Sequence, residues 1–208
     1  MTPKPVVVRR PVKFLAALMI LGGVVQAMPA RAETATLAEQ DDKGDPAKHF
    51  TGSVTWQVGK EAHSGRAAPL EVRADIVFPE RGMSVLWVLR RNTDRSLPAT
   101  HTIEVKFKLP ANFPSAGITT VPGVAMKATE QARGTPLAGV TAKVTNEYFL
   151  IGLSALPGDA KLNADLLRDE KWLDILVVYA NGTRAIVTAE KGAAGEHAFA
   201  EAFAAWAK

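Results

Sequence analysis

The chain has 208 residues, of which 47% are hydrophobic and 22% are charged, and its formal net charge is +4. This composition is typical of one globular domain of ordinary size and excludes an intrinsically disordered chain. The absence of cysteine excludes a disulfide framework, thiolate metal ligands, iron–sulfur clusters, a cysteine nucleophile and a lipid-modified cysteine.

The positive charge is concentrated at the start of the chain. Residues 1–32 contain five basic and no acidic residues, whereas the remainder has 20 Lys and Arg against 21 Asp and Glu. Proteins that bind nucleic acids need a basic excess that neutralises phosphates. Because residues 33–208 have no such excess, we expect no nucleic-acid partner.

Residues 1–32 have the pattern of a Sec signal peptide. A basic stretch from Arg9 to Lys13 precedes an uncharged apolar run over residues 14–25, and Ala30-Arg31-Ala32 is a small-x-small cleavage motif. The run is shorter than the roughly 20 apolar residues that span a bilayer. We therefore expect a periplasmic or secreted protein.

Two alternatives concern the leader. Cleavage after Ala32 would leave Glu33 first, and an earlier cut after Ala27 is the other candidate. An uncleaved leader would instead anchor the domain to the membrane, and this would be its only contact with a bilayer.

The segment after the leader is polar. Residues 33–50 include five acidic residues ahead of Pro46. We interpret this segment as a flexible acidic lead-in and residues 51–208 as a single β-rich domain.

Strands dominate the first half of that domain. Apolar and polar residues alternate over Ser53–Val58, Leu70–Phe78 and Thr102–Leu109, a period of two that is typical of half-buried strands. Met83–Leu89 is almost continuously apolar, which predicts a central strand covered on both faces. Tyr148–Leu153 predicts a further buried strand, and three short strands are expected near 118–121, 124–127 and 140–144.

Helices are predicted at two places. Asp159 is a candidate N-cap for an internal helix with an apolar stripe of leucines over Leu162–Leu167. Glu196–Lys208 predicts a terminal helix, because three aromatic residues recur at i, i+4 and i+7: Phe199, Phe203 and Trp206.

The strongest short-range signal is a hairpin. Asn181-Gly182 separates the apolar runs Trp172–Tyr179 and Thr183–Thr188, and this dipeptide favours a tight turn between antiparallel strands. Together these elements predict a mainly β (α+β) fold, either an antiparallel β-sandwich or a curved sheet. It would contain about eight or nine short strands, one internal helix and a C-terminal helix.

Catalytic and metal-binding motifs are absent from the sequence. It contains no H-E-x-x-H, no G-x-S-x-G and no glycine-rich nucleotide loop. The four histidines, His49, His63, His101 and His197, do not lie at helical metal-ligand spacing, and we expect structural or solvated roles for them. The sequence therefore predicts no catalytic, cofactor-binding or metal-binding residue.

One loop is a candidate partner or anion site. Arg90, Arg91 and Arg95 lie between a buried strand and Pro98, and clustered arginines bind carboxylates, phosphates or anionic surfaces. The alternative is a charged loop in which Asp94 pairs with the arginines.

The aromatic residues could serve either the core or a binding surface. The stripe of the terminal helix and the three tryptophans Trp56, Trp87 and Trp172 are expected in the core, with a docking face or interface as the alternative.

Several short motifs resemble a group of uncharacterised secreted or anchored alphaproteobacterial proteins. The resemblance extends from His49 to Trp206, and it implies relatives without implying an activity. The segments that carry it are 50–56, 73–81, 89–103, 122–124, 134–139, 149–154 and 190–203.

The last third of the chain is similar to the invasion-associated locus B family of envelope proteins. The similarity lies in the element order strand, Leu-rich helix, strand, strand and terminal helix with phenylalanines, over Tyr148–Leu153, Leu162–Leu167, Ile175–Tyr179, Arg184–Thr188 and Phe199–Phe203. Members of that family usually carry cysteines in the middle, which this chain lacks. The resemblance implies a non-enzymatic envelope protein, connected in some members with host-cell entry.

Two function hypotheses follow. The first is a non-catalytic periplasmic or cell-envelope domain that binds an envelope protein or an anionic envelope component, without a cofactor. The second is an envelope enzyme or small-ligand carrier whose site is assembled from distant residues, because catalytic groups are neighbours in space and need not be neighbours in sequence. A pocket that contains a histidine or an acid with a perturbed pKa would favour the second hypothesis.

Overall fold

The computed structural model describes residues 32–40, 46–60 and 69–207. The expected signal peptide lies outside the described residues, apart from Ala32. Eleven strands, two α-helices and one short 3-10 helix, η1 (Pro79–Arg81), make up the described fold. The strands are β1 (Glu33–Gln40), β2 (Lys48–Lys60), β3 (Leu70–Phe78), β4 (Met83–Arg91), β5 (Ala99–Lys108), β6 (Ile118–Lys127), β7 (Thr135–Pro136), β8 (Gly139–Lys143), β9 (Tyr148–Ser154), β10 (Trp172–Tyr179) and β11 (Arg184–Glu190). The helices are α1 (Pro157–Asp169) and α2 (Gly192–Trp206).

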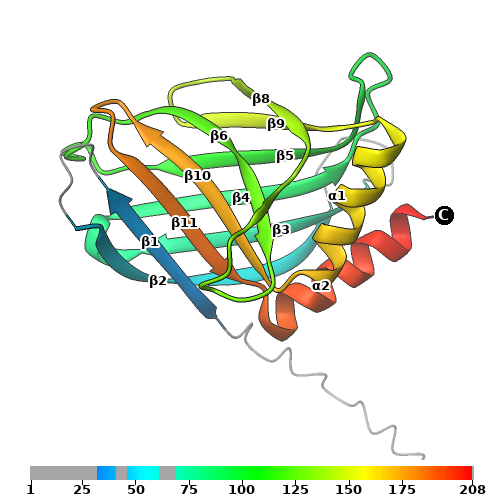
Figure 1. The fold of residues 1–208 in the computed structure, drawn as a ribbon, viewed down its shortest axis with the longest axis horizontal. Coiled ribbons are helices and arrows are strands. Elements are labelled where there is room, and N and C mark those ends of the chain that lie inside the picture. Colours follow the sequence, from blue (N-terminus) through cyan, green and yellow to red (C-terminus); the bar gives the residue numbers. More distant parts are fainter. Residues whose placement is uncertain (1–31, 41–45, 61–68, 208) are drawn as a thin grey trace, which may run out of the picture.

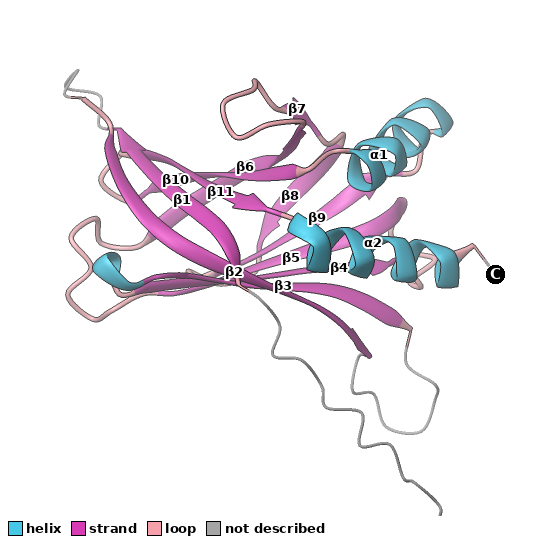
Figure 2. Ribbon diagram, turned by 90° about the horizontal axis from the view of Figure 1, so that it is seen from below, coloured by secondary structure: helices cyan, strands magenta, loops and turns pink. Residues whose placement is uncertain are grey.

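All the described strands belong to one antiparallel sheet. Its order is β7-β6-β10-β11-β1-β2-β3-β4-β5-β9-β8, so the chain's first strand pairs with its last one near the middle of the sheet. The sheet curls on itself into a half-barrel, and the two helices lie side by side at one end of it (Figures 1 and 2). Helix α2 contacts β2 and β3, and α1 contacts β9 and β6.

The concave face of the sheet carries the core. Alternate residues of each long strand point inward, as the period of two predicts, and they are almost fully buried. Helix α2 supplies Phe199, whose ring lies 5.5 Å from that of Trp56 and 5.9 Å from that of Trp87. These rings fill the helical end of the half-barrel. Trp172 was also expected in the core but is only half-buried.

The prediction of a mainly β fold with one internal and one terminal helix is confirmed, whereas the strand count was too low. Of the two architectures left open, the structure has the curved sheet and not two packed sheets. The turn at Asn181-Gly182 is also confirmed, because Gly182 has a φ of 87° and the N–H of Tyr179 bonds the carbonyl of Thr183. The predicted element order of the last third agrees with β9, α1, β10, β11 and α2.

The flexible lead-in over residues 33–50 was a wrong prediction. Glu33–Gln40 forms β1, which pairs with both β11 and β2, and β2 already begins at Lys48. The acidic side chain of Glu39 is 8% exposed because it accepts hydrogen bonds from Tyr179 Oη and Arg81 Nη2, both at 2.9 Å. A carboxylate that accepts two such hydrogen bonds can be buried. The acidic residue Glu39 therefore does not indicate a solvated segment.

Both helices begin earlier than expected. Helix α1 starts with Pro157 after Leu156, and Asp159 lies inside its first turn instead of serving as N-cap. Pro is well suited to the first helical position because its missing N–H is not needed there. Helix α2 starts at Gly192, four residues before the predicted Glu196.

Candidate functional site

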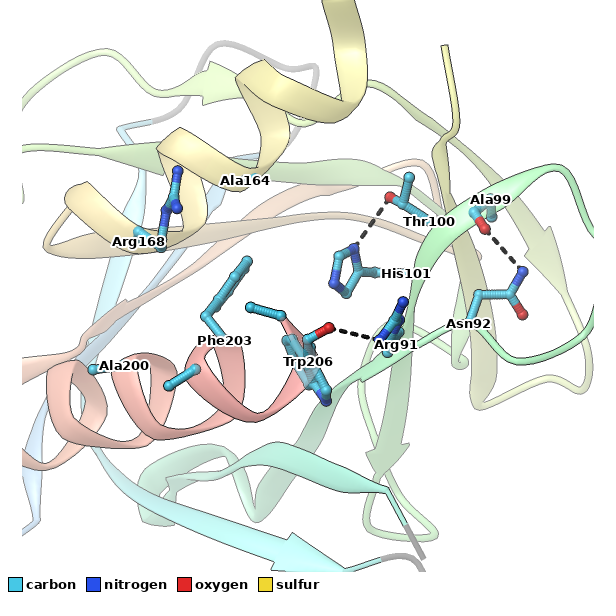
Figure 3. Close-up of a pocket in the computed structure, with 12 residues that line it drawn as sticks. Arg91, Asn92, Ala99, Thr100, His101, Ala164, Arg168, Ala200, Phe203 and Trp206 are labelled. Atoms are coloured by element: carbon cyan, nitrogen blue, oxygen red, sulfur yellow. Dashed lines mark hydrogen bonds between the residues drawn. The ribbon is translucent and has the colours of Figure 1, made fainter. Parts of the chain in front are cut away.

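An open groove lies where the two helices meet the strand ends of β4 and β5. We call it the helical groove; its volume is about 760 Å³, within the usual range for small-molecule sites. The residues that line it are Arg91, Asn92, Ala99, Thr100, His101, Ala164, Arg168, Ala200, Phe203, Ala204, Trp206 and Ala207 (Figure 3).

Small side chains leave this space open. Ala200 and Ala204 of α2 and Ala207, the residue after its end, are spaced at i, i+4 and i+7, so they share one side of the helix. Ala164 of α1 also lines the groove. A methyl group in each of these positions cannot fill the space between the helices and the end of the sheet, which therefore remains a groove.

Three rings form the floor beside the alanines. The imidazole of His101 lies 5.0 Å from the Trp206 ring and 5.7 Å from the Phe203 ring, and the last two are 5.1 Å apart. Trp206 is fixed by a hydrogen bond from its Nε1 to the carbonyl of Leu70, at 3.0 Å. The floor is thus a connected aromatic surface that joins β5 to α2.

The charged groups that line the groove are both arginines. Arg91 is directly opposite His101 in the antiparallel register of β4 and β5, and its Nη1 donates to the carbonyl oxygen of Trp206 at 2.6 Å. Arg168 of α1 lies over the Phe203 ring at 5.8 Å and also bonds Asp165 of the same helix. None of the described residues that line the groove carries a carboxylate, so their charges favour an anion.

His101 is uncharged at neutral pH. Burial among the rings, followed by the nearby charge of Arg91, lowers its pKa from 6.5 to about 4. Its Nδ1 lies 3.1 Å from Oγ1 of Thr100. We expected a structural or solvated histidine here; the structure places a half-buried one in the helical groove.

The structure separates the three arginines that the sequence grouped. Arg90 points to the convex face of the sheet, where its Nε donates to Glu71 at 2.6 Å and its Nη1 to Glu104. Burial by itself would raise the pKa of Glu104. The hydrogen bond that Lys106 donates and the positive charge of Arg90 outweigh burial, so the pKa of Glu104 is lowered. Successive residues of a strand face opposite sides, so Arg90 cannot join Arg91 in one site.

Arg95 lies on an exposed and tightly bonded loop away from the groove. The side-chain amide of Asn92 donates to the carbonyls of Asp94, Leu97 and Ala99 within 3.0 Å. The Asp94 carboxylate accepts from the N–H and hydroxyl of Ser96, at 2.8 and 2.7 Å, and these bonds lower its pKa. In these bonds the partner of Asp94 is Ser96, whereas the alternative predicted from the sequence pairs Asp94 with the arginines.

Sequence reasoning found only part of the groove. It selected Arg91, Phe203 and Trp206 for separate reasons, and it passed over His101 and Arg168. A signal was present in the alanines at i, i+4 and i+7 beside the aromatic stripe of α2, because a small-residue side on a packed helix leaves room for another group.

The described residues hold no metal cluster and no membrane-spanning helix. Within residues 32–40, 46–60 and 69–207, no group of three or more His, Asp or Glu side chains converges to hold a metal ion. Neither described helix is long and apolar enough to cross a membrane.

The fold and the groove together define a curled antiparallel half-barrel with a helical end that offers a cationic and aromatic recess. No family model, no curated protein and no solved structure matches the chain.

Proposed function

We propose that this protein is a non-catalytic domain of the cell envelope that binds another envelope component in the helical groove. The observation that carries the proposal is the described lining of the groove, which has two arginines, a neutral histidine and an aromatic floor but no carboxylate side chain. Such a lining recognises an anionic or amphipathic partner. The pattern of a Sec signal peptide supports a periplasmic or secreted location, with an uncleaved membrane anchor as the alternative.

The chemistry of the groove favours binding over catalysis. A general base works best when its pKa lies near the operating pH, whereas His101 has a pKa of about 4. Thr100 is the only hydroxyl residue among the described side chains that line the groove, and none of these is a carboxylate that would orient the imidazole. A hydroxyl beside a histidine of low pKa, without a described orienting carboxylate, fits binding better than acyl transfer.

A second candidate is an envelope enzyme or small-ligand carrier. The observation that favours it is a histidine with a strongly lowered pKa inside a groove, since perturbed groups cluster at functional sites. A turnover that is lost in His101→Gln, with the melting temperature unchanged, would establish this alternative and overturn the non-catalytic proposal.

Site-specific photo-crosslinking tests the binding surface. A photoreactive side chain is placed at Ala204, which lines the groove, or at Ala193, an exposed position of α2 outside it. We expect adducts with one envelope component at position 204 and none at position 193, and a several-fold lower yield at 204 when Arg91→Gln is added. Equal adducts at both positions, or no adduct at 204, would contradict the proposal.

A further inference from the structure

We infer that the helical groove binds a small aliphatic monocarboxylate, with the carboxylate on Arg91 and the apolar chain along the alanine side of α2. This inference rests on the proposed function of the groove as a binding surface. It adds the chemical class of the ligand.

Arg91 supplies the anion end. A guanidinium has five N–H donors in a planar fork that matches a carboxylate, and Arg91 uses one nitrogen to bond the Trp206 carbonyl. That bond holds the guanidinium at the edge of the aromatic floor. Among the described residues no other is hydrogen-bonded to the Arg91 guanidinium, so its remaining donors are available to a ligand in the groove.

The two arginines of the groove differ in their partners. Arg168 bonds the carboxylate of Asp165 at 2.6 Å, and Lys161 bonds the other oxygen of the same carboxylate at 2.6 Å, so the charge of Arg168 is partly offset. His101 adds no charge because burial keeps its pKa at about 4. Arg91, whose side chain bonds only a backbone carbonyl among the described residues, is therefore the stronger anion site, and its planar fork matches one carboxylate.

The apolar side of the groove matches an extended chain. Ala207 follows Ala200 by seven positions at the end of α2, which corresponds to roughly 10 Å at 1.5 Å per residue, and Ala204 lies between them. Ala164 faces the same space from α1, and the rings of Phe203 and Trp206 complete the surface. A ligand as small as acetate would leave this surface wet, whereas an alkyl chain would remove it from water.

Calorimetric titration of the full chain with decanoate, at pH 7.5 and below its micellar concentration, tests the inference. Acetate, inorganic phosphate and 1-decanol are the comparison probes. We expect decanoate to bind, acetate and phosphate to show no binding, and decanol to bind at least tenfold more weakly. Arg91→Gln should weaken decanoate binding at least tenfold, and the matched control Arg95→Gln should leave it unchanged.

Groove-filling variants test the apolar part without touching a charge. Ala200→Leu and Ala204→Leu should each weaken decanoate binding at least tenfold, and Ala193→Leu on the same helix should not. Melting temperatures within a few degrees of wild type show that each variant is folded. If Arg91→Gln unfolds, Arg91→Lys is used, because it keeps the charge and removes the planar fork.

The possible failures are distinguishable. Equal binding of decanol and decanoate, with Ala200→Leu still weakening both, overturns the carboxylate class and leaves the groove as a binding surface. Decanoate binding that is unaffected by Arg91→Gln and Ala200→Leu places the ligand elsewhere and overturns the inference. Absence of decanoate binding also overturns it, and crosslinking at position 204 then decides the proposed function independently.

Discussion

At the scale of single residues, the least expected side chain is the lysine between the two helices. Lys191 is 0% exposed, and its Nζ donates to the carbonyl of Leu167, in the last turn of α1, at 2.6 Å. The same ammonium lies 4.1 Å from the centre of the Phe199 ring. The C-terminal end of a helix attracts a cation, so Lys191 ties the end of α1 to the start of α2.

This buried ammonium predicts a pH-dependent stability. Burial lowers the pKa of Lys191 from 10.5 to about 8. Between these two pH values the unfolded chain holds a proton that the folded protein has lost, so the free energy of unfolding rises with pH. Relative to Lys191→Met, we expect wild type to gain about 3 kcal/mol across that range, from about 1.4 kcal/mol per pKa unit.

Urea denaturation of wild type and Lys191→Met from pH 7 to 10.5 measures this difference. Groups that titrate identically in both proteins cancel, which leaves the contribution of Lys191. A difference that stays constant over the whole range would mean that the folded protein keeps this proton.

At the scale of secondary-structure elements, α2 packs very closely against β2. Gly195 lies where α2 approaches Trp56, and an added Cβ there would lie 2.9 Å from Cβ of Lys191 and 3.1 Å from the Trp56 ring. These distances are shorter than normal van der Waals contacts. The absence of a side chain at Gly195 therefore permits the packing of the terminal helix on the sheet.

Gly195→Ala should for this reason destabilise the protein. Alanine normally stabilises a helix by about 1 kcal/mol relative to glycine. Here we expect a net loss of about 1–3 kcal/mol in the free energy of unfolding, because overpacking a tight contact costs that much. Chemical denaturation measures it.

Gly158→Ala is the matched control, since nothing lies within 4 Å of its added Cβ in the first turn of α1. We expect it to be neutral or to stabilise by less than about 1 kcal/mol. Equal stabilisation by both substitutions would show that the contact at Gly195 is not tight in solution.

At the scale of the whole molecule, β1 makes the sheet continuous. It is the only described strand between β11 and β2, and Ala35 and Leu37 of β1 are fully buried. Removing it would expose two sheet edges in the middle of the half-barrel and leave Arg81 and Tyr179 without Glu39.

A chain that begins at Pro46 should therefore fail to fold, whereas one that begins at Glu33 should fold. The expected loss is comparable with the whole net stability of a domain, about 5–15 kcal/mol. Circular dichroism melting and size-exclusion chromatography would show a cooperative monomer only for the longer chain. Cooperative melting of the chain that begins at Pro46 would restore the interpretation of residues 33–50 as a lead-in.

The sequence by itself determined the local elements. The period of two located the long strands, Asn181-Gly182 located the β10–β11 turn, and the aromatic spacing of the last residues identified α2. These predictions succeed because burial on one face and turn conformation are imposed within a few residues along the chain. The same local reasoning failed at residues 33–40, because the partners that bury Glu39 are Arg81 and Tyr179, far along the chain.

Only the tertiary structure decided the site. Strand alternation sends Arg90 to the convex face and Arg91 to the groove, and the register of β4 and β5 places Arg91 opposite His101. The curl of the sheet and the packing of α2 then bring Trp206 to both of them, more than a hundred residues along the chain. The volume of a groove depends on which faces of the elements meet in the folded protein. A local sequence pattern does not specify that volume, because the faces come from segments far apart in the chain.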